Sequence, residues 1–280
     1  MELEKLVNKA YKFNQSDIID KFDKKLNKDV KNGFCMMLSM NWLLYAKRYE
    51  NEKDPALTAM KILWGICSLD NIKEIPTEQA HMALLKQIAS QHRAFMDQKK
   101  VSESQLSEAS KSIVDVLVKQ SVKDVERYGV LLALIYGAKK YGLMEQEVDL
   151  TGYQDGYKWR GIYDTIMSAI EEKSVNYLML SIRFKDGTGH GIGIWLDAPG
   201  KSARVFDPNF GMASATNCSI AYKGFKKAPK DKKDMKAEVD PKDGKKEKEA
   251  DQLKQIIKAI AADYANAKFK EASVMQFELK

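Results

Sequence analysis

Hydrophobic residues recur at helical spacing through the first half of the chain. Between Phe34 and Tyr49 they fall at every third or fourth position, which predicts a helix that begins just after Gly33. Residues 1–31 are charged, with scattered apolar positions that predict one or two short helices. Prolines and capping-type residues predict where later helices begin, and the expected ranges are 55–69, 76–98, 102–119 and 121–141.

The pattern changes after residue 150, where runs of β-branched and aromatic residues alternate with turn signals. The dipeptide Asp186-Gly187 predicts a hairpin between two of these runs. The expected strands are 177–184, 190–196, 203–206 and 274–279, and the expected helices are 161–172 and 250–267. Helices first and an antiparallel sheet second predict an α+β fold.

Positive charge is concentrated in one segment. The chain has 280 residues, 46 Lys and Arg against 39 Asp and Glu, and a net charge of +7. Residues 223–248 hold eleven lysines and six acidic residues, a net of +5, and hardly any large apolar residues. Such a segment buries too little surface to offset the entropy of ordering it, so we predict a flexible, solvated loop. A contact with an anionic membrane or an acidic partner is the alternative. The segment has no aromatic residue besides Phe225, and this scarcity disfavours specific nucleic-acid binding.

Composition excludes several other classes of protein. Three cysteines without close pairing predict neither a disulfide framework nor a zinc site, and nothing predicts a cofactor. The longest apolar run, 130–135, is too short to span a bilayer. The N-terminus has no apolar signal-peptide core, and Glu2 stands where myristoylation needs glycine.

Cys35 is the candidate nucleophile. It stands at the start of the predicted 34–49 helix, where the helix dipole and free N–H groups lower the pKa of a thiol. Cys67 falls in the middle of a predicted helix and Cys218 in a polar turn, so we interpret both as structural.

A base and an orienting group follow later in the chain. His81 and His92 fall within one predicted helix and suit packing or surface roles, whereas His190 opens a strand after a glycine-rich turn. Asp207 directly follows the next strand, where its carboxylate can accept a hydrogen bond from the imidazole and fix its tautomer. A cysteine on a helix N-terminus, then a histidine and an aspartate on a sheet, match papain-like hydrolases in order and placement.

Three sequence blocks resemble one family. The segment Gly33-Phe34-Cys35 through Leu38-Ser39 to Trp42 resembles the Gly-x-Cys-x-x-Leu-Ser-x-x-Trp block of the YopT/AvrPphB effector cysteine proteases. The glycine-rich strand entry at His190 and the segment 206–211 are similar to that family's histidine and aspartate blocks. The resemblance implies a single papain-like catalytic domain over 1–280, with the nucleophile helix packed on an antiparallel sheet. Within it we expect a helical insertion at about 53–150 and the flexible loop at 223–248.

The resemblance implies that Cys35 is the nucleophile, His190 the general base and acid, and Asp207 the orienting residue. Papain-like enzymes place a side-chain amide a few residues before the cysteine, in the oxyanion hole. Here the sixth residue upstream is Asp29, so we expect Asn32 to serve there with the backbone N–H of Cys35.

The resulting prediction is a cysteine protease, a bacterial effector exported without a classical signal peptide, that cleaves a host protein in the host cytosol. One alternative keeps the same three residues but performs deamidation or acyl or amide transfer, and a cell-wall amidase is a further variant. A second alternative is a non-enzymatic helical binding module with a basic tether, which predicts no thiol of lowered pKa.

Overall fold

The structure is a computed structural model of the whole chain. It describes residues 2–7, 12–20, 30, 34–64, 81–89, 92, 148–156, 166, 177–197, 202–215, 252–265 and 269–279. In these residues helices and an antiparallel sheet occur together, so the α+β prediction is confirmed.

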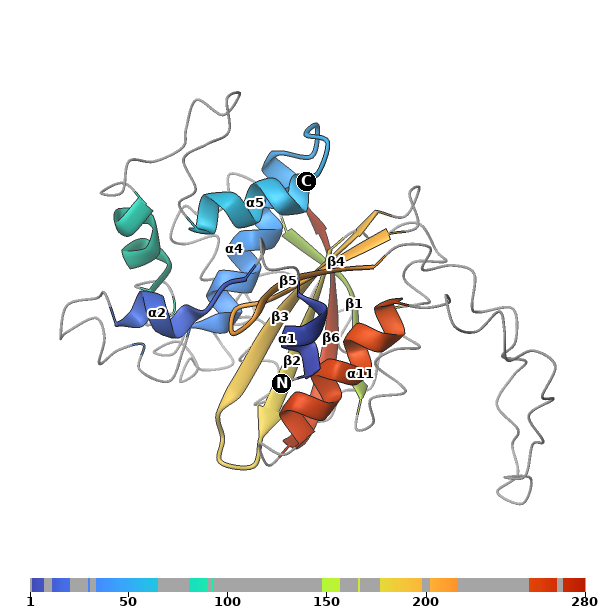
Figure 1. The fold of residues 1–280 in the computed structure, drawn as a ribbon. Coiled ribbons are helices and arrows are strands. Elements are labelled where there is room, and N and C mark those ends of the chain that lie inside the picture. Colours follow the sequence, from blue (N-terminus) through green and yellow to red (C-terminus); the bar gives the residue numbers. More distant parts are fainter. Residues whose placement is uncertain are drawn as a thin grey trace, which may run out of the picture.

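A six-stranded sheet forms the centre of the described structure (Figure 1). Its strands in chain order are β1 (Val148–Gly156), β2 (Tyr177–Phe184), β3 (Gly189–Asp197), β4 (Ser202–Asp207), β5 (Gly211–Ala215) and β6 (Phe269–Leu279). They lie side by side in the order β1-β6-β2-β3-β4-β5, and every neighbouring pair is antiparallel. The last strand of the chain therefore lies inside the sheet, between the first two.

Helices cover both faces of this sheet (Figure 1). On one face lie α4 (Cys35–Arg48) and α5 (Pro55–Trp64), and on the other lie α1 (Glu2–Leu6) and α11 (Gln252–Ala265). The remaining labelled helix is α2 (Gln15–Ile19), and residues 81–89 are also helical. Two hydrophobic clusters, one on each side of the sheet, fill the space between these layers.

Helix α4 packs close to β3 because two of the three glycines of that strand, Gly191 and Gly193, lie against the helix. A Cβ placed on Gly191 would lie 2.8 Å from the Cα of Met36 and 2.2 Å from its sulfur. A Cβ on Gly193 would lie 2.7 Å from the ring of Trp42, which stacks on Phe206 with ring centroids 5.4 Å apart. Any larger residue would push α4 away from the sheet.

Helix α11 covers the opposite face with one apolar stripe. Its buried large side chains fall at spacings of three and four residues, as expected for an amphipathic helix, and are Leu253, Ile256, Ile257, Ile260 and Tyr264. They pack against the β-strand residues of the second cluster. Tyr264, the last of the stripe, is the one that carries a polar group.

Most sequence-predicted elements in the described ranges are present. The helix predicted at 34–49 is α4, and the predicted hairpin is β2 and β3 with Gly187 at a φ of 84°. The prediction missed β1 and β5, because VDLTGYQDG and GMASA lack an apolar run with strand-like alternation. It also began β6 at 274, whereas the strand begins at Phe269.

Several other predictions lie outside the described residues. They are the helices 102–119 and 121–141, the 223–248 loop, and most of the helices 76–98 and 161–172. The insertion at 53–150 and the single domain over 1–280 remain predictions. Within residues 53–150 the structure describes α5, which packs on α4, the helical residues 81–89, and the first residues of β1.

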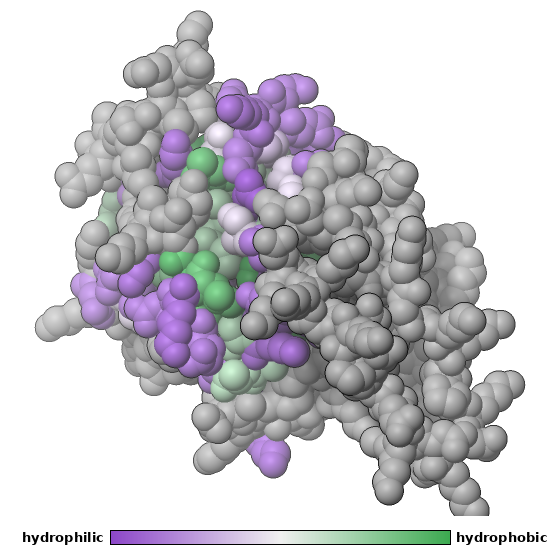
Figure 2. Space-filling model, turned by 45° about the vertical axis from the view of Figure 1, so that its right-hand side comes forward, coloured by the Kyte–Doolittle hydropathy of each residue, from purple (hydrophilic) through white to green (hydrophobic). Residues whose placement is uncertain are grey.

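On the face shown in Figure 2, hydrophilic residues dominate the described surface, and hydrophobic ones show in a smaller area between them. Among the residues whose side chains the structure describes, which leaves out β1 and much of β6, Leu6 is the one large hydrophobic residue that is exposed. No helix in these ranges is both long enough and apolar enough to cross a membrane.

Candidate active site

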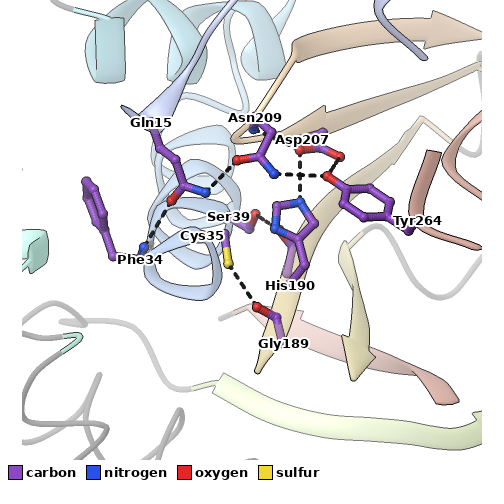
Figure 3. Close-up of polar contacts among 10 residues, drawn as sticks. Gln15, Phe34, Cys35, Ser39, Gly189, His190, Asp207, Asn209 and Tyr264 are labelled. Atoms are coloured by element: carbon purple, nitrogen blue, oxygen red, sulfur yellow. Dashed lines mark hydrogen bonds and ion pairs between the residues drawn. The ribbon is translucent and has the colours of Figure 1, made fainter. Parts of the chain in front are cut away.

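Cys35 is the first residue of α4 and is buried, with 4% of its surface exposed. The N-cap residue, Phe34, has no side chain that can cap the helix, and the first N–H groups of a helix have no intrahelical acceptor. The thiol lies 3.8 Å from the carbonyl oxygen of Gly189, at the start of β3 (Figure 3). The thiol thus sits where a helix N-terminus meets a strand entry.

His190 and Asp207 meet at one edge of the sheet because their strands are antiparallel neighbours. Gly193 pairs with Phe206, so the start of β3 lies beside the end of β4. The ring Nε2 of His190 is 2.9 Å from Oδ1 of Asp207, and the two residues are 4% and 0% exposed. The sheet register therefore brings together residues that are 17 positions apart.

The hydrogen bonds of Asp207 determine the tautomer of His190. Besides the ring of His190, the backbone N–H of Asn209 donates to Oδ1 at 2.8 Å and the hydroxyl of Tyr264 donates to Oδ2 at 2.9 Å. A carboxylate that accepts from all three needs a proton on Nε2 of His190. That leaves Nδ1 to face the Cys35 thiol, with which the ring also forms a hydrogen bond.

Opposing effects act on the thiol of Cys35. Burial is the largest, and by itself it raises the pKa. The positive charge of His190, its hydrogen bond to the sulfur and a backbone hydrogen bond from Gly191 lower the pKa, while the charge of Asp207 raises it slightly. The lowering effects prevail, so the pKa of Cys35 lies below that of an ordinary thiol and favours the thiolate.

The pKa of His190 moves the opposite way. Burial, the largest effect, lowers it, but the charges of Asp207 and Cys35 and the hydrogen bonds to both raise it. The pKa rises from 6.5 to about 10. Both shifts favour a thiolate beside an imidazolium over a neutral thiol beside a neutral imidazole.

Three further residues belong to this polar cluster, and the sequence analysis assigned none of them. Gln15, from α2, accepts the backbone N–H of Phe34 at 3.0 Å and donates to the side chain of Asn209 at 2.6 Å. Asn209 donates in turn to the hydroxyl of Tyr264 at 3.1 Å (Figure 3). Asn209 lies in the 206–211 block, and Tyr264 belongs to the apolar stripe of the predicted 250–267 helix, whereas Gln15 had no sequence signal.

The other candidate residues do not reach this cluster or are not described. Asn32, the expected oxyanion-hole amide, lies outside the described residues, as do Cys67 and Cys218. The ring Nε2 of His81 forms a hydrogen bond with the carbonyl oxygen of Leu63 at 2.7 Å, which fits its packing role. Within the described ranges, no three His, Cys, Asp or Glu side chains are grouped so that they could hold a metal ion.

Comparison with known proteins finds one similar solved structure and no matching family model or curated protein. Among solved structures, the chain is similar to the crystal structure of the Pseudomonas avirulence protein AvrPphB, with 15% identity and a TM-score of 0.46. The match covers 93% of this chain and 99% of that one. At this identity and TM-score we base neither the fold nor the activity on the likeness.

Chemically, the cluster combines what covalent catalysis by a thiol requires. It has a buried thiol of lowered pKa, an imidazole that contacts it, and a carboxylate that fixes the far side of the imidazole. The N–H groups at the start of α4 lie beside the sulfur and can stabilise negative charge that develops next to it.

Proposed function

We propose that the protein is a cysteine protease of papain-like arrangement, with Cys35 as nucleophile, His190 as general base and acid, and Asp207 as orienting residue. The buried hydrogen bond between His190 and Asp207, with Cys35 on the other side of the same ring, carries the proposal. The ordered resemblance of the three sequence blocks to the YopT/AvrPphB effector proteases supports it independently.

In the first half of the reaction, the thiolate of Cys35 attacks the carbonyl carbon of the scissile amide. A carbon–sulfur bond forms, and the carbonyl electron pair moves to oxygen as a tetrahedral oxyanion. The backbone N–H of Cys35, at the start of α4, stabilises that charge. Collapse of the intermediate breaks the carbon–nitrogen bond, and the leaving amine takes the proton from Nδ1 of His190.

In the second half, water hydrolyses the resulting thioester. His190, now neutral, removes a proton from the water through Nδ1 while the hydroxide oxygen bonds to the acyl carbon. Loss of the carbon–sulfur bond releases the acid and restores the thiolate beside the imidazolium. Asp207 accepts from Nε2 throughout, which keeps the ring in the one orientation that serves both steps.

The resemblance to effector proteases also supports a finer proposal about the setting. The protein is exported from a bacterium into a host cell, and its substrate is a host protein in the cytosol. The same thioester chemistry serves amide deamidation and acyl transfer, so the products distinguish these reactions.

The test is mass spectrometry of host-cell extract after incubation with the purified protein. We expect new protein N-termini with the unaltered chain and none with Cys35→Ser, whereas Cys218→Ser, which removes a cysteine interpreted as structural, leaves the cleavage unchanged. An amide converted to an acid, or an acyl adduct, without any new N-terminus would replace the protease proposal by one of its alternatives. Equal cleavage by the Cys35→Ser variant would overturn the role of Cys35.

A further inference from the structure

Tyr264 touches two of the three proposed catalytic residues but has no place in the reaction above. Its hydroxyl donates to Oδ2 of Asp207, and its ring stacks on the His190 ring with centroids 4.8 Å apart and planes at 30° (Figure 3). The side chain comes from α11, more than fifty residues after Asp207 in the sequence. Tyr264 is 8% exposed, so it separates this side of the site from solvent.

The direction of the Tyr264 hydrogen bond follows from a chain that starts at a backbone amide. The N–H of Phe34 can only donate, so the atom of Gln15 that it meets is the amide oxygen. The amide nitrogen of Gln15 therefore donates to the side-chain oxygen of Asn209, and the nitrogen of Asn209 donates to the Tyr264 oxygen. With its oxygen already accepting, the hydroxyl directs its proton to Asp207.

The hydroxyl also remains protonated over the working range of pH. Burial, followed by the charge of Asp207, raises the pKa of Tyr264 far above its usual value. The hydroxyl is therefore a permanent donor to the carboxylate, and each bond from Phe34 to Asp207 has one fixed direction.

We infer that Tyr264 is a positioning residue, which holds the carboxylate of Asp207 in the rotation that presents Oδ1 to His190. The inference rests on the proposed function and deepens it. Oδ1 already accepts from His190 and from the Asn209 backbone, whereas Tyr264 is the donor found on Oδ2. Without that bond the carboxylate can rotate about its last torsion, and the His190 ring loses its fixed partner. Stacking of the Tyr264 ring restricts the imidazole from its face at the same time.

The chain of bonds also connects this effect to the nucleophile. It begins at Phe34, directly before Cys35, and ends at Asp207, which acts back on Cys35 through His190. Two elements distant in sequence, α2 and α11, thus each supply one link of this polar network through Gln15 and Tyr264.

The test compares Tyr264→Phe with Tyr177→Phe, since each removes one hydroxyl from a buried tyrosine. Tyr177 lies five residues along β2 from Ile182, the partner of His190, and so serves as the matched control. The rate of Cys35 alkylation by iodoacetamide is followed against pH, with the Cys35 peptide resolved by mass spectrometry. We expect Tyr264→Phe to lower the rate at about pH 6 by roughly threefold or more, because a hydrogen bond to a charged group is lost. Tyr177→Phe should leave the pH profile unchanged.

A second variant, Asn209→Ala, removes the donor that directs the hydroxyl and should shift the profile in the same direction. The inference is overturned if Tyr264→Phe keeps the pH profile of the unaltered chain. If Tyr264→Phe does not fold, a folded Asn209→Ala that keeps this profile overturns it instead. A shift toward higher reactivity at low pH would overturn it equally. The proposed function fails separately, if Cys35 of the unaltered chain already titrates like a free thiol.

Discussion

Asp207 is the residue on which the site depends most, because it is fully buried and accepts three hydrogen bonds from three different elements. An ionised carboxylate is an acceptor only, which suits three donors without conflict. Its charge also raises the pKa of His190, and the positive charge of His190 lowers the pKa of Cys35 by more than the charge of Asp207 raises it.

Replacing Asp207 by Asn is therefore expected to weaken both reactivity and stability. An amide lacks the charge and places two N–H donors where donors already point, so at least one buried group loses its partner. We expect the free energy of unfolding to fall by about 1–3 kcal/mol and the alkylation of Cys35 at low pH to slow strongly. Urea unfolding and iodoacetamide alkylation measure the two effects. Asp197→Asn, at the other end of β3, is the control and should change neither.

The thiolate–imidazolium pair also predicts how stability depends on pH. The pKa of His190 is raised by folding, so the contribution of His190 to the free energy of unfolding is fully present below about pH 6.5 and is lost as pH rises through about 10. The pKa of Cys35 is lowered by folding, so the contribution of Cys35 to the free energy of unfolding is present above the pKa of an ordinary thiol. It is lost as pH falls through the lowered pKa of the folded state. The pair thus stabilises the fold most between the two folded-state values.

The check is the difference in unfolding free energy between the unaltered chain and Cys35→Ser across this range of pH. We expect the difference to be largest near neutral pH and to shrink toward both ends. A difference that stays constant with pH would mean that the pair is not ionised.

Sequence alone indicated the residues that we propose to perform chemistry, but not those that hold them in place. Cys35, His190 and Asp207 each stand beside a local signal, namely a helix start, a glycine-rich turn and a strand end. Gln15 has no such signal, and Asn209 lies in the 206–211 block, but the contact between them spans 194 positions of the chain and no local pattern predicts it. In the sequence Tyr264 is one more apolar residue of an amphipathic helix, because its hydrogen-bond partner Asp207 is known only from the tertiary structure.

At the scale of elements, the contact between α4 and β3 decides whether Cys35 reaches His190. Gly191 allows that contact, since a Cβ there would meet the backbone of Met36 at 2.8 Å. A flexible side chain can move away, but a helix backbone cannot do so without displacing the whole helix.

We therefore expect Gly191→Ala to shift the start of α4 and to abolish the enhanced reactivity of Cys35, together with a loss of about 1–3 kcal/mol of stability. Gly193→Ala is the matched comparison, because its nearest contact is the Trp42 ring, with the nearest backbone atom, the Ser39 oxygen, at 3.3 Å, and because it lies two residues farther from His190. It should destabilise the fold while affecting the pH profile of Cys35 less. Equal profiles for Gly191→Ala and the unaltered chain would contradict this role.

The elements themselves were predictable where their patterns are strong. Apolar spacing gave α4 and α11, and alternation with a turn signal gave β2, β3 and β4. Strands β1 and β5 are held by pairing with β6 and β4 rather than by their own apolar pattern. The position of β6 between β1 and β2 depends on long-range pairing, which no local pattern predicts.

At the scale of the whole molecule, segments near the N-terminal end of the chain and helix α11, nearer its other end, both contact elements around the site. Phe13 and Gln15 donate backbone N–H groups to the turn after Asp207, at the carbonyl oxygens of Phe210 and Pro208. At the other end, the carboxylate of Asp263, next to Tyr264, accepts the N–H groups of Glu2 and Leu3 at the start of α1, both at 2.8 Å.

Asp263 thus fastens α1 to α11, and its removal should loosen that contact. We expect Asp263→Ala to lower the free energy of unfolding by about 0.5–2 kcal/mol, as for the loss of a helix-capping carboxylate. Thermal or urea unfolding measures this, with Lys258→Ala on the exposed side of the same helix as control. A variant as stable as the control would show that the contact adds nothing to stability.

The central claim is that the fold makes Cys35 an activated nucleophile, and the pH dependence of its alkylation by iodoacetamide tests that most directly. Cys67 and Cys218 of the same molecule provide internal references when each peptide is resolved by mass spectrometry. We predict that the rate for Cys35 titrates with an apparent pKa well below the about 8.5 of a free cysteine, and that His190→Ala removes this difference. An apparent pKa at or above that of a free cysteine in the unaltered chain would contradict the claim.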